Sequence, residues 1–325
     1  MATTWEPAPA RTIQELGGRS DSELLDMARR LAYCRPLLPY PGWRFDADWN
    51  NPDPAFAARR AIWECLSRRP CEKAVEIGWH YGIRLLLHLE NDLGRQLFVG
   101  GCIDPNEFFF LDRFLRPGMR VLDVGAHEGL YTLFAARRVE PEGEVWALEP
   151  SVREFSRLRQ NLKINHLTNV RVFQVAAGEV NGPGELLVAA DEHSGHNTLG
   201  AFACSGVKAV ARQSVDLRPV DELCKEWGVT RLDLIKLDTE GAEHRVLRGA
   251  GGVLRRFRPV VLFEVAGDAL RHQGSNPEEL MDYFRQLGYR LYAFDDRTGL
   301  PRPVEEGPLS ANLVATPRGR ERLWA

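Results

Sequence analysis

From about residue 118 onward, short apolar runs rich in β-branched residues alternate with stretches that repeat apolar positions every three to four residues. The first pattern is typical of buried strands and the second of helices that pack on a sheet. Several of the strand-like runs are continuously apolar, which is expected when helices cover both faces of a sheet. The predicted strands are RVLDV (120–124), EVWAL (144–148), VRVFQV (170–175), DLIKL (233–237), PVVLFEV (259–265), YRLYAF (289–294) and NLVAT (312–316).

The stretches between these strands have the periodicity of helices. One of them opens with Asn276-Pro277-Glu278, a helix-start signal because asparagine caps the first turn and proline fits inside it. Regular alternation of strands and helices predicts an α/β fold with a doubly wound, mostly parallel, seven-stranded sheet. The predicted helices cover residues 129–138, 151–165, 243–255 and 277–287.

Two parts of the chain break this alternation. Between about 182 and 217, the strand-like runs GPGELLVAA and VKAVARQSVDL enclose the polar segment DEHSGHNTLG, which predicts a small β insert over the sheet edge. Residues 1–95 lack the alternation and contain the amphipathic stretch SDSELLDMARRLAY, whose Ser or Asp can cap a helix. We therefore expect a mostly helical accessory region over 1–95 and a domain with the sheet and the insert over 96–325.

Composition restricts the partners and the location. With 44% hydrophobic and 27% charged residues, a chain of 325 residues can bury a core without disulfides. A net charge of -3 argues against nucleic acid as a partner, because a phosphate backbone requires a basic surface. The six cysteines are not closely paired, and neither a secretory signal nor a membrane-spanning run is visible. These features predict a cytoplasmic protein with no membrane partner, and they are compatible with a homodimer.

The segment VLDVGAHEGLYT (121–132) joins the first predicted strand to a helix through two glycines, Gly125 and Gly129. Small residues at this point let the backbone approach a ligand at the carboxyl end of the sheet. Glu149 closes the next strand, where a carboxylate can accept hydrogen bonds from both hydroxyls of a ribose. We expect an adenosine-containing cofactor to be bound by Asp123, Gly125, Ala126, His127, Gly129, Glu149, Pro150 and Asp238.

Two cofactors contain adenosine and suit such a sheet. A dinucleotide would require three glycines as G-x-G-x-x-G, with its pyrophosphate over a helix N-terminus, whereas the spacing here is D-x-G-x-x-x-G. Asp123 and Glu128 would repel a pyrophosphate but attract the ammonium and sulfonium groups of S-adenosylmethionine (SAM). The charges therefore favour SAM, and an NAD(P)-dependent oxidoreductase is the alternative.

Four stretches carry a family resemblance: GGCIDPNEFFFLDRFLRPGMRVLDVGAHEGLYTLFAA, ALEPSVREFSRLRQNLKIN, RLDLIKLDTEGAEHRVLRGAGGVL and PVVLFEV. Together, over about residues 100–265, they resemble the FkbM-type family of class I SAM-dependent methyltransferases, which have a Rossmann-like sheet. The family's loop usually reads DVGAN-x-G, so His127 stands where an asparagine is common. The resemblance implies methyl transfer to a small-molecule hydroxyl acceptor, usually on a secondary metabolite, a sugar or a glycolipid.

Carboxylates gather at the expected acceptor side. Asp238 and Glu240 follow the strand at 233–237, at the same edge of the sheet as the cofactor segment, and Glu264 ends the next predicted strand. These acids can take a proton from the acceptor, bind a cation or cap a helix. Asp238 is the favoured base, because a strand end fixes its position. A divalent metal fits three acids but is not favoured, because Mg²⁺ usually takes only one or two carboxylates.

The polar segment of the insert adds a histidine to the candidate catalytic residues. His196 lies among glycines and polar residues, as in loops that close over a substrate, and imidazole titrates near the operating pH of most enzymes. An exposed loop histidine without a chemical role is the competing interpretation.

Other acceptors and other classes of protein are also considered. N-methylation of a small molecule or peptide is one alternative. A SAM-fold binding protein without catalysis is another, but it would not need the Asp238-Thr-Glu240-Gly241 corner. Methylation of a nucleic-acid base is disfavoured, because no tetrapeptide of the Asn-Pro-Pro-Tyr kind is present.

Overall fold

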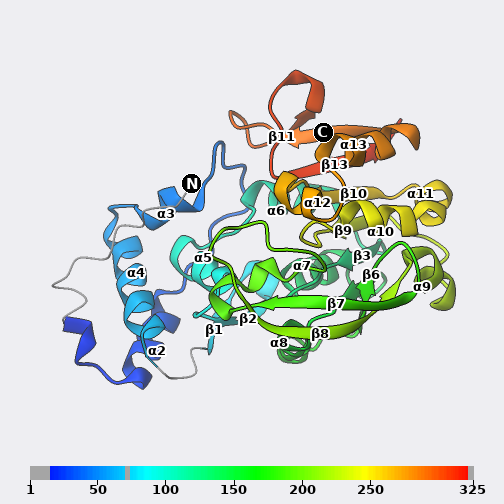
Figure 1. Ribbon diagram of the computed structural model, residues 1–325. Helices are drawn as coiled ribbons and strands as arrows, with labels where there is room; N and C mark the ends of the chain where they lie inside the picture. The colour runs from blue at the N-terminus through cyan, green and yellow to red at the C-terminus, as the bar shows by residue number, and fades with distance from the viewer. Residues whose placement is uncertain (1–14, 70–73, 321–325) are drawn as a thin grey trace.

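The computed structural model describes residues 15–69 and 74–320 (Figure 1). At its centre is an eight-stranded sheet in the order β12 (Pro301–Pro303), β11 (Tyr289–Phe294), β13 (Asn312–Pro317), β10 (Val260–Glu264), β9 (Leu234–Leu237), β3 (Arg120–Val124), β4 (Glu144–Leu148) and β5 (Val170–Phe173). Neighbours from β10 to β5 pair in parallel, and β13 is antiparallel to both β10 and β11. The mostly parallel α/β sheet is confirmed with its seven predicted strands, to which β12 adds a short edge.

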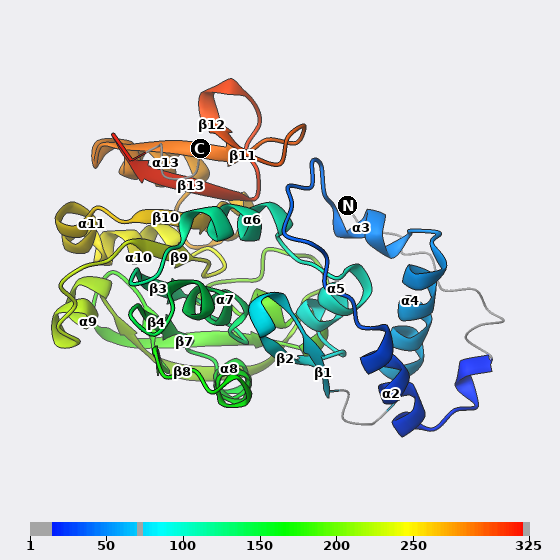
Figure 2. The same cartoon turned by 180° about the vertical axis from the view of Figure 1, so that it is seen from behind.

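Helices cover both faces of this sheet (Figures 1 and 2). They are α6 (Pro105–Phe114), α7 (Leu130–Val139), α8 (Val152–Asn165), α9 (Val220–Glu226), α10 (Glu243–Gly249), α11 (Gly251–Phe257), α12 (Gly267–His272) and α13 (Pro277–Gln286). Successive residues of a strand point to opposite faces, so Val121 joins the core that contains Phe134 of α7, whereas Leu122 joins the core that contains Val246 of α10. The same alternation turns Asp123 toward α7.

The helix predicted over 243–255 is two helices, α10 and α11, that meet at Ala250. Glycines surround this junction in the sequence Gly249-Ala-Gly-Gly252, and glycine weakens a helix interior. Asp221 fixes the break, because its carboxylate accepts hydrogen bonds from the backbone N–H groups of Gly252 and Val253 at 2.7 Å each. Helical periodicity alone could not predict this cap, because Asp221 is far from Gly252 in the sequence.

The insert forms a separate sheet in the order β6 (Ala176–Ala177), β8 (Ala209–Arg218) and β7 (Gly182–Ala189). Between β7 and β8 the chain makes the 3-10 turn η2 (Asp191–His196), which lies against α5 (Asp92–Gly100). Ser194 donates a hydrogen bond to Asp92 Oδ1 at 3.0 Å, and the backbone N–H of Gly195 donates to Oδ2 at 3.2 Å. The polar segment of the insert is therefore attached to the N-terminal part of the chain.

The N-terminal part contains a hairpin that the sequence analysis did not predict. Its two strands alternate buried and less buried residues over only five positions each, which is too short a run to stand out. Trp79, directly after the first strand, packs against Phe108 of α6 and Phe134 of α7, with ring centroids 5.0 and 5.7 Å away. The elements are α2 (Asp21–Leu31), α3 (Phe45–Trp49), α4 (Pro54–Ser67), β1 (Ala74–Gly78), η1 (His80–Gly82), β2 (Arg84–His88) and α5.

Two predicted helix starts are confirmed. Ser20 and Glu23 form a capping box at the start of α2, and Asn276 accepts a hydrogen bond from the backbone N–H of Glu279 at the start of α13. No helix in the described ranges has the length and apolar character needed to cross a membrane.

Candidate active site

A cavity of about 410 Å³ lies at the carboxyl ends of β3, β4, β9 and β10. Gly125, Glu149, Asp238 and Glu264 line it, each at or directly after the end of one of these strands. The η2 segment and the start of α5 line it as well. Parallel strands bring their carboxyl ends to one edge, which explains how residues more than a hundred positions apart share one cavity.

The turn after β3 touches the turn after β9. Gly125 has a φ of 78°, in the left-handed region that favours glycine. A Cβ atom added there would lie 1.7 Å from the carbonyl oxygen of Asp238. Gly125 is therefore required for close contact between the two turns, and not only for its own backbone conformation.

Glu149 is buried at the end of β4 with both carboxylate oxygens bonded. Oε2 accepts a hydrogen bond from the backbone N–H of His127, and Oε1 accepts one from that of Ser151, both at 2.8 Å. Burial raises the pKa of Glu149 to about 7, although nearby His127 and the two N–H donors oppose that rise. Each carboxylate oxygen has a second lone pair, so this group can also accept hydrogen bonds from a ligand.

His127 adopts a φ of 49°, so the residue that replaces the family's asparagine keeps a left-handed turn. Asparagine adopts this conformation more readily than most residues. The imidazole Nε2 lies 3.2 Å from Ser194 Oγ, which links the turn after β3 to the insert. Burial opposes protonation, but four carboxylates, of which Glu128 acts most strongly, raise the pKa of His127.

Three acidic or glycine positions of the cofactor motif lie outside the cavity lining. Asp123 is buried and accepts a hydrogen bond from Thr132 Oγ1 at 2.6 Å. Glu128 accepts hydrogen bonds from Asn91 and Arg157, and Gly129 starts α7 against Leu158. Ala126 and Pro150, in contrast, line the cavity. The sequence pattern could not separate residues that shape the turn from residues that face a ligand.

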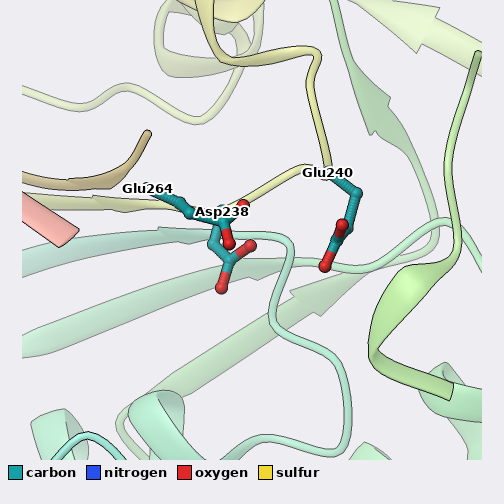
Figure 3. A group of neighbouring side chains, drawn as sticks. All are labelled: Asp238, Glu240 and Glu264. Carbon is teal, nitrogen blue, oxygen red and sulfur yellow. The ribbon is translucent and has the colours of Figure 1, made fainter. Parts of the chain in front are cut away.

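The structure brings the three predicted acceptor-side carboxylates together (Figure 3). One oxygen from each of Asp238, Glu240 and Glu264 lies within 4.8 Å of the others. Glu264 has one buried oxygen without a hydrogen bond, and burial, followed by the charge of Asp238, raises its pKa well above the usual value. Burial likewise raises the pKa of Glu240. Three carboxyl groups therefore meet at this edge of the cavity, and burial favours the neutral forms of Glu240 and Glu264.

Lys236, which the sequence analysis did not select, lies beside Asp238 in the same cavity. Its Nζ is 3.0 Å from Asp238 Oδ2 and 3.4 Å from the carbonyl oxygen of Gly125, and it lies 4.7 Å from the ring centroid of Tyr131. Burial lowers the pKa of Lys236, but Asp238 and Asp123 outweigh that effect and raise it. The ammonium group of Lys236 therefore stays charged beside the turn after β3. The sequence did contain a signal for this residue, because a lysine within an otherwise apolar strand is unusual.

A divalent cation could bridge carboxylates at this spacing. Two of the three already have a positive or ionisable partner, because Asp238 pairs with Lys236 and Glu240 lies 3.5 Å from His196 Nδ1. This arrangement reduces the need for a metal.

The cavity suits SAM in shape and charge. Leu148, Val175 and Leu186 provide apolar lining that an adenine ring can contact, and Glu149 lies within the same cavity. Acidic residues of the lining, among them Asp238 and Asp92, complement a sulfonium and an ammonium. The sheet and this cavity define a class I SAM-dependent methyltransferase, an α/β enzyme in which SAM supplies the methyl group.

The sequence profile of the methyltransferase FkbM domain matches residues 123–291. The chain belongs to this family, and the FkbM-type assignment made from its motifs is confirmed. The alternative of an NAD(P)-dependent oxidoreductase was wrong.

Two of the named relatives are O-methyltransferases. The 2-O-methyltransferase NoeI of Sinorhizobium fredii is 26% identical over 260 residues, which cover 73% of this chain and 99% of that protein. The 31-O-demethyl-FK506 methyltransferase FkbM of Streptomyces tacrolimicus is 31% identical over 159 residues, covering 42% and 60%. The crystal structure of methyltransferase FkbM from Methylobacillus flagellatus KT aligns with a TM-score of 0.41 and 16% identity, over 69% of this chain and 55% of that one.

Proposed function

We propose that this enzyme methylates a hydroxyl group of a small, polar acceptor that carries no negative charge. The observation that carries this proposal is that one cavity is lined both by Gly125 and Glu149 and by Asp238, Glu240 and His196. The names of the two relatives, both O-methyltransferases, support the choice of a hydroxyl.

The charges along the cavity favour some acceptors over others. Arg95 and Lys236 are its only positively charged lining residues among those described, histidines aside, whereas acids line it in larger number. An anionic acceptor would meet these carboxylates at short range, which is unfavourable in a partly buried site. The lining acids are Asp92, Asp104, Glu149, Asp238, Glu240 and Glu264.

In the proposed reaction, the protein's main tasks are alignment and proton removal. When bound, SAM supplies an electrophilic methyl group on its sulfonium. The acceptor oxygen must lie in line with that methyl group, and a base must take the hydroxyl proton as the new bond forms. The acceptor-side carboxylates and His196 can hold the hydroxyl and accept its proton.

Methyl transfer from isotopically labelled SAM to a panel of small acceptors tests the proposal. The panel should contain neutral methyl glycosides, the same sugars as phosphates, and primary amines. We expect O-methylated neutral glycosides as products, identified by mass spectrometry. Exclusive methylation of amines, or preference for the sugar phosphates, would contradict it.

We also expect that a chelator leaves turnover unchanged. Loss of turnover with the chelator, restored by added Mg²⁺, would instead show that the enzyme depends on a metal.

The affinity for SAM should increase as the pH rises through about 7, because the ionised form of Glu149 is the better acceptor for ribose hydroxyls. A carboxylate with this pKa goes from about one tenth to nine tenths ionised between pH 6 and pH 8, so the affinity should change by up to about tenfold. Calorimetric titrations at the two pH values measure the effect.

Glu149→Gln is the variant that assigns this pH dependence. It should weaken SAM binding by about 1 to 3 kcal/mol at pH 8 and make the affinity nearly independent of pH. Glu185→Gln, at an exposed residue of β7 paired with Arg212, is the matched control and should behave like the wild type. A pH dependence that persists in Glu149→Gln would assign it to another group, such as His127.

A further inference from the structure

Glu240 is held in an unusual backbone conformation. Its φ of 50° lies in the left-handed region, which a residue with a long side chain rarely adopts. The carbonyl oxygen of Glu240 accepts hydrogen bonds from Thr198 Oγ1 at 2.9 Å and from Gln273 Nε2 at 3.1 Å. Gln273 also donates to Thr198 Oγ1 at 3.1 Å. Two segments far apart in the sequence thus stabilise a strained residue, as is common at functional sites.

This conformation places the Glu240 carboxylate beside His196. Oε2 of Glu240 lies 3.5 Å from Nδ1 of His196, and the side chains are 19% and 33% exposed in the wall of the cavity. Hydrogen bonding to Glu240 raises the pKa of His196 against the effect of burial, and the charges of Asp92 and Asp238 act in the same direction. A further titratable neighbour is His193, whose ring centroid lies 6.1 Å away.

Asp238, the base favoured by the sequence, is engaged differently. Its Oδ2 pairs with Lys236, which also contacts the carbonyl oxygen of Gly125. Lys236 thus connects Asp238 to the turn after β3. His196 belongs to η2 and has a carboxylate, that of Glu240, beside Nδ1, the arrangement by which enzymes orient an imidazole base.

The geometry points to His196 as the general base and to Glu240 as the residue that positions it, an assignment that rests on the proposed O-methylation. The acceptor O–H bond breaks, and its proton moves to Nε2 of His196. The oxygen forms a bond to the methyl carbon as the bond between that carbon and sulfur breaks. S-adenosylhomocysteine leaves, and the imidazolium, paired with Glu240, then releases its proton to solvent.

Kinetics of His196→Ala test the base, with the best methyl glycoside of the panel as acceptor. We expect turnover to fall about a hundredfold or more, with little change in the affinity for SAM. Added imidazole should restore part of the turnover, which a purely structural role would not allow. His272→Ala removes an exposed imidazole of α12 outside the cavity and should behave like the wild type. Turnover of His196→Ala within threefold of the wild type would overturn the assignment.

Nuclear magnetic resonance tests the pair without any acceptor. The pKa of His196, followed by its ring signals, should be lower in Glu240→Gln than in the wild type. Thr198→Val, which removes one hydrogen bond to the Glu240 backbone, should move it in the same direction by a smaller amount. An unchanged pKa of His196 in Glu240→Gln would overturn the positioning role.

These experiments separate the two proposals. If the wild type methylates only amines, the proposed function fails, and the pKa of His196 still decides whether Glu240 and His196 form a pair. If the wild type methylates hydroxyls and His196→Ala does so equally well, only the assignment of the base fails.

Discussion

Gly125→Ala is expected to abolish SAM binding and to destabilise the fold. The new Cβ atom would lie 1.7 Å from the backbone carbonyl oxygen of Asp238, far inside any contact distance, and this oxygen cannot move aside as the end of a flexible side chain could. Relief requires the turn after β3 to move away from the turn after β9. We expect the free energy of unfolding to fall by about 4 kcal/mol or more, the scale of the most disruptive substitutions. Chemical denaturation and calorimetry with SAM measure the two effects.

Gly118→Ala is a matched control for this substitution. Gly118 has the same φ of 78°, and an added Cβ atom would have no neighbour within 4 Å. Gly118→Ala should therefore lower the free energy of unfolding only by the strain of the left-handed backbone, about 1 to 2 kcal/mol, and it should leave SAM binding intact. Equal destabilisation by the two substitutions would show that backbone strain, and not contact between the two turns, determines the effect at Gly125.

Asp238→Asn should reduce turnover about a hundredfold, because it removes a fixed charge from the reacting end of the cavity while keeping the shape of the side chain. The charge of Lys236, 3.0 Å from Asp238 in the wild type, would then lack this partner in the cavity that binds SAM. Steady-state kinetics with SAM and the chosen methyl glycoside measure this effect.

A double-mutant cycle with Lys236→Met identifies the cause. If Asp238 acts mainly by neutralising Lys236, the double variant should recover much of the turnover lost in Asp238→Asn. If Asp238 contacts the acceptor directly, the two losses should accumulate. Normal turnover of Asp238→Asn alone would remove this carboxylate from the reaction.

The parts of the fold that repeat a local pattern were predictable from the sequence. The strand at 120–124, the turn at Gly125 and the carboxylates at Asp238 and Glu264 follow from apolar runs that end in polar residues. Strand order then brings the acids together, since parallel strands share an edge. The local pattern therefore predicted which carboxylates would meet.

Features that depend on distant contacts could not be read from the pattern. The break at Ala250 depends on Asp221, and the conformation of Glu240 depends on Thr198 and Gln273. Lys236 was overlooked because sequence periodicity does not show that it reaches the turn after β3, where its Nζ contacts the carbonyl oxygen of Gly125, in addition to Asp238 two positions along. Each case needs a contact between segments that sequence periodicity treats separately.

The packing of Trp79 has a consequence for how this enzyme can be divided. The family match starts at residue 123, yet the aromatic face of α7 that lies within it, around Phe134, is covered by a residue from outside the match. Phe108, also outside the match, contacts the same ring. A fragment starting at residue 96 would expose part of this surface to water and should aggregate or unfold more readily than the full chain. We therefore expect that the segment which defines the family cannot fold as a detached module in this protein.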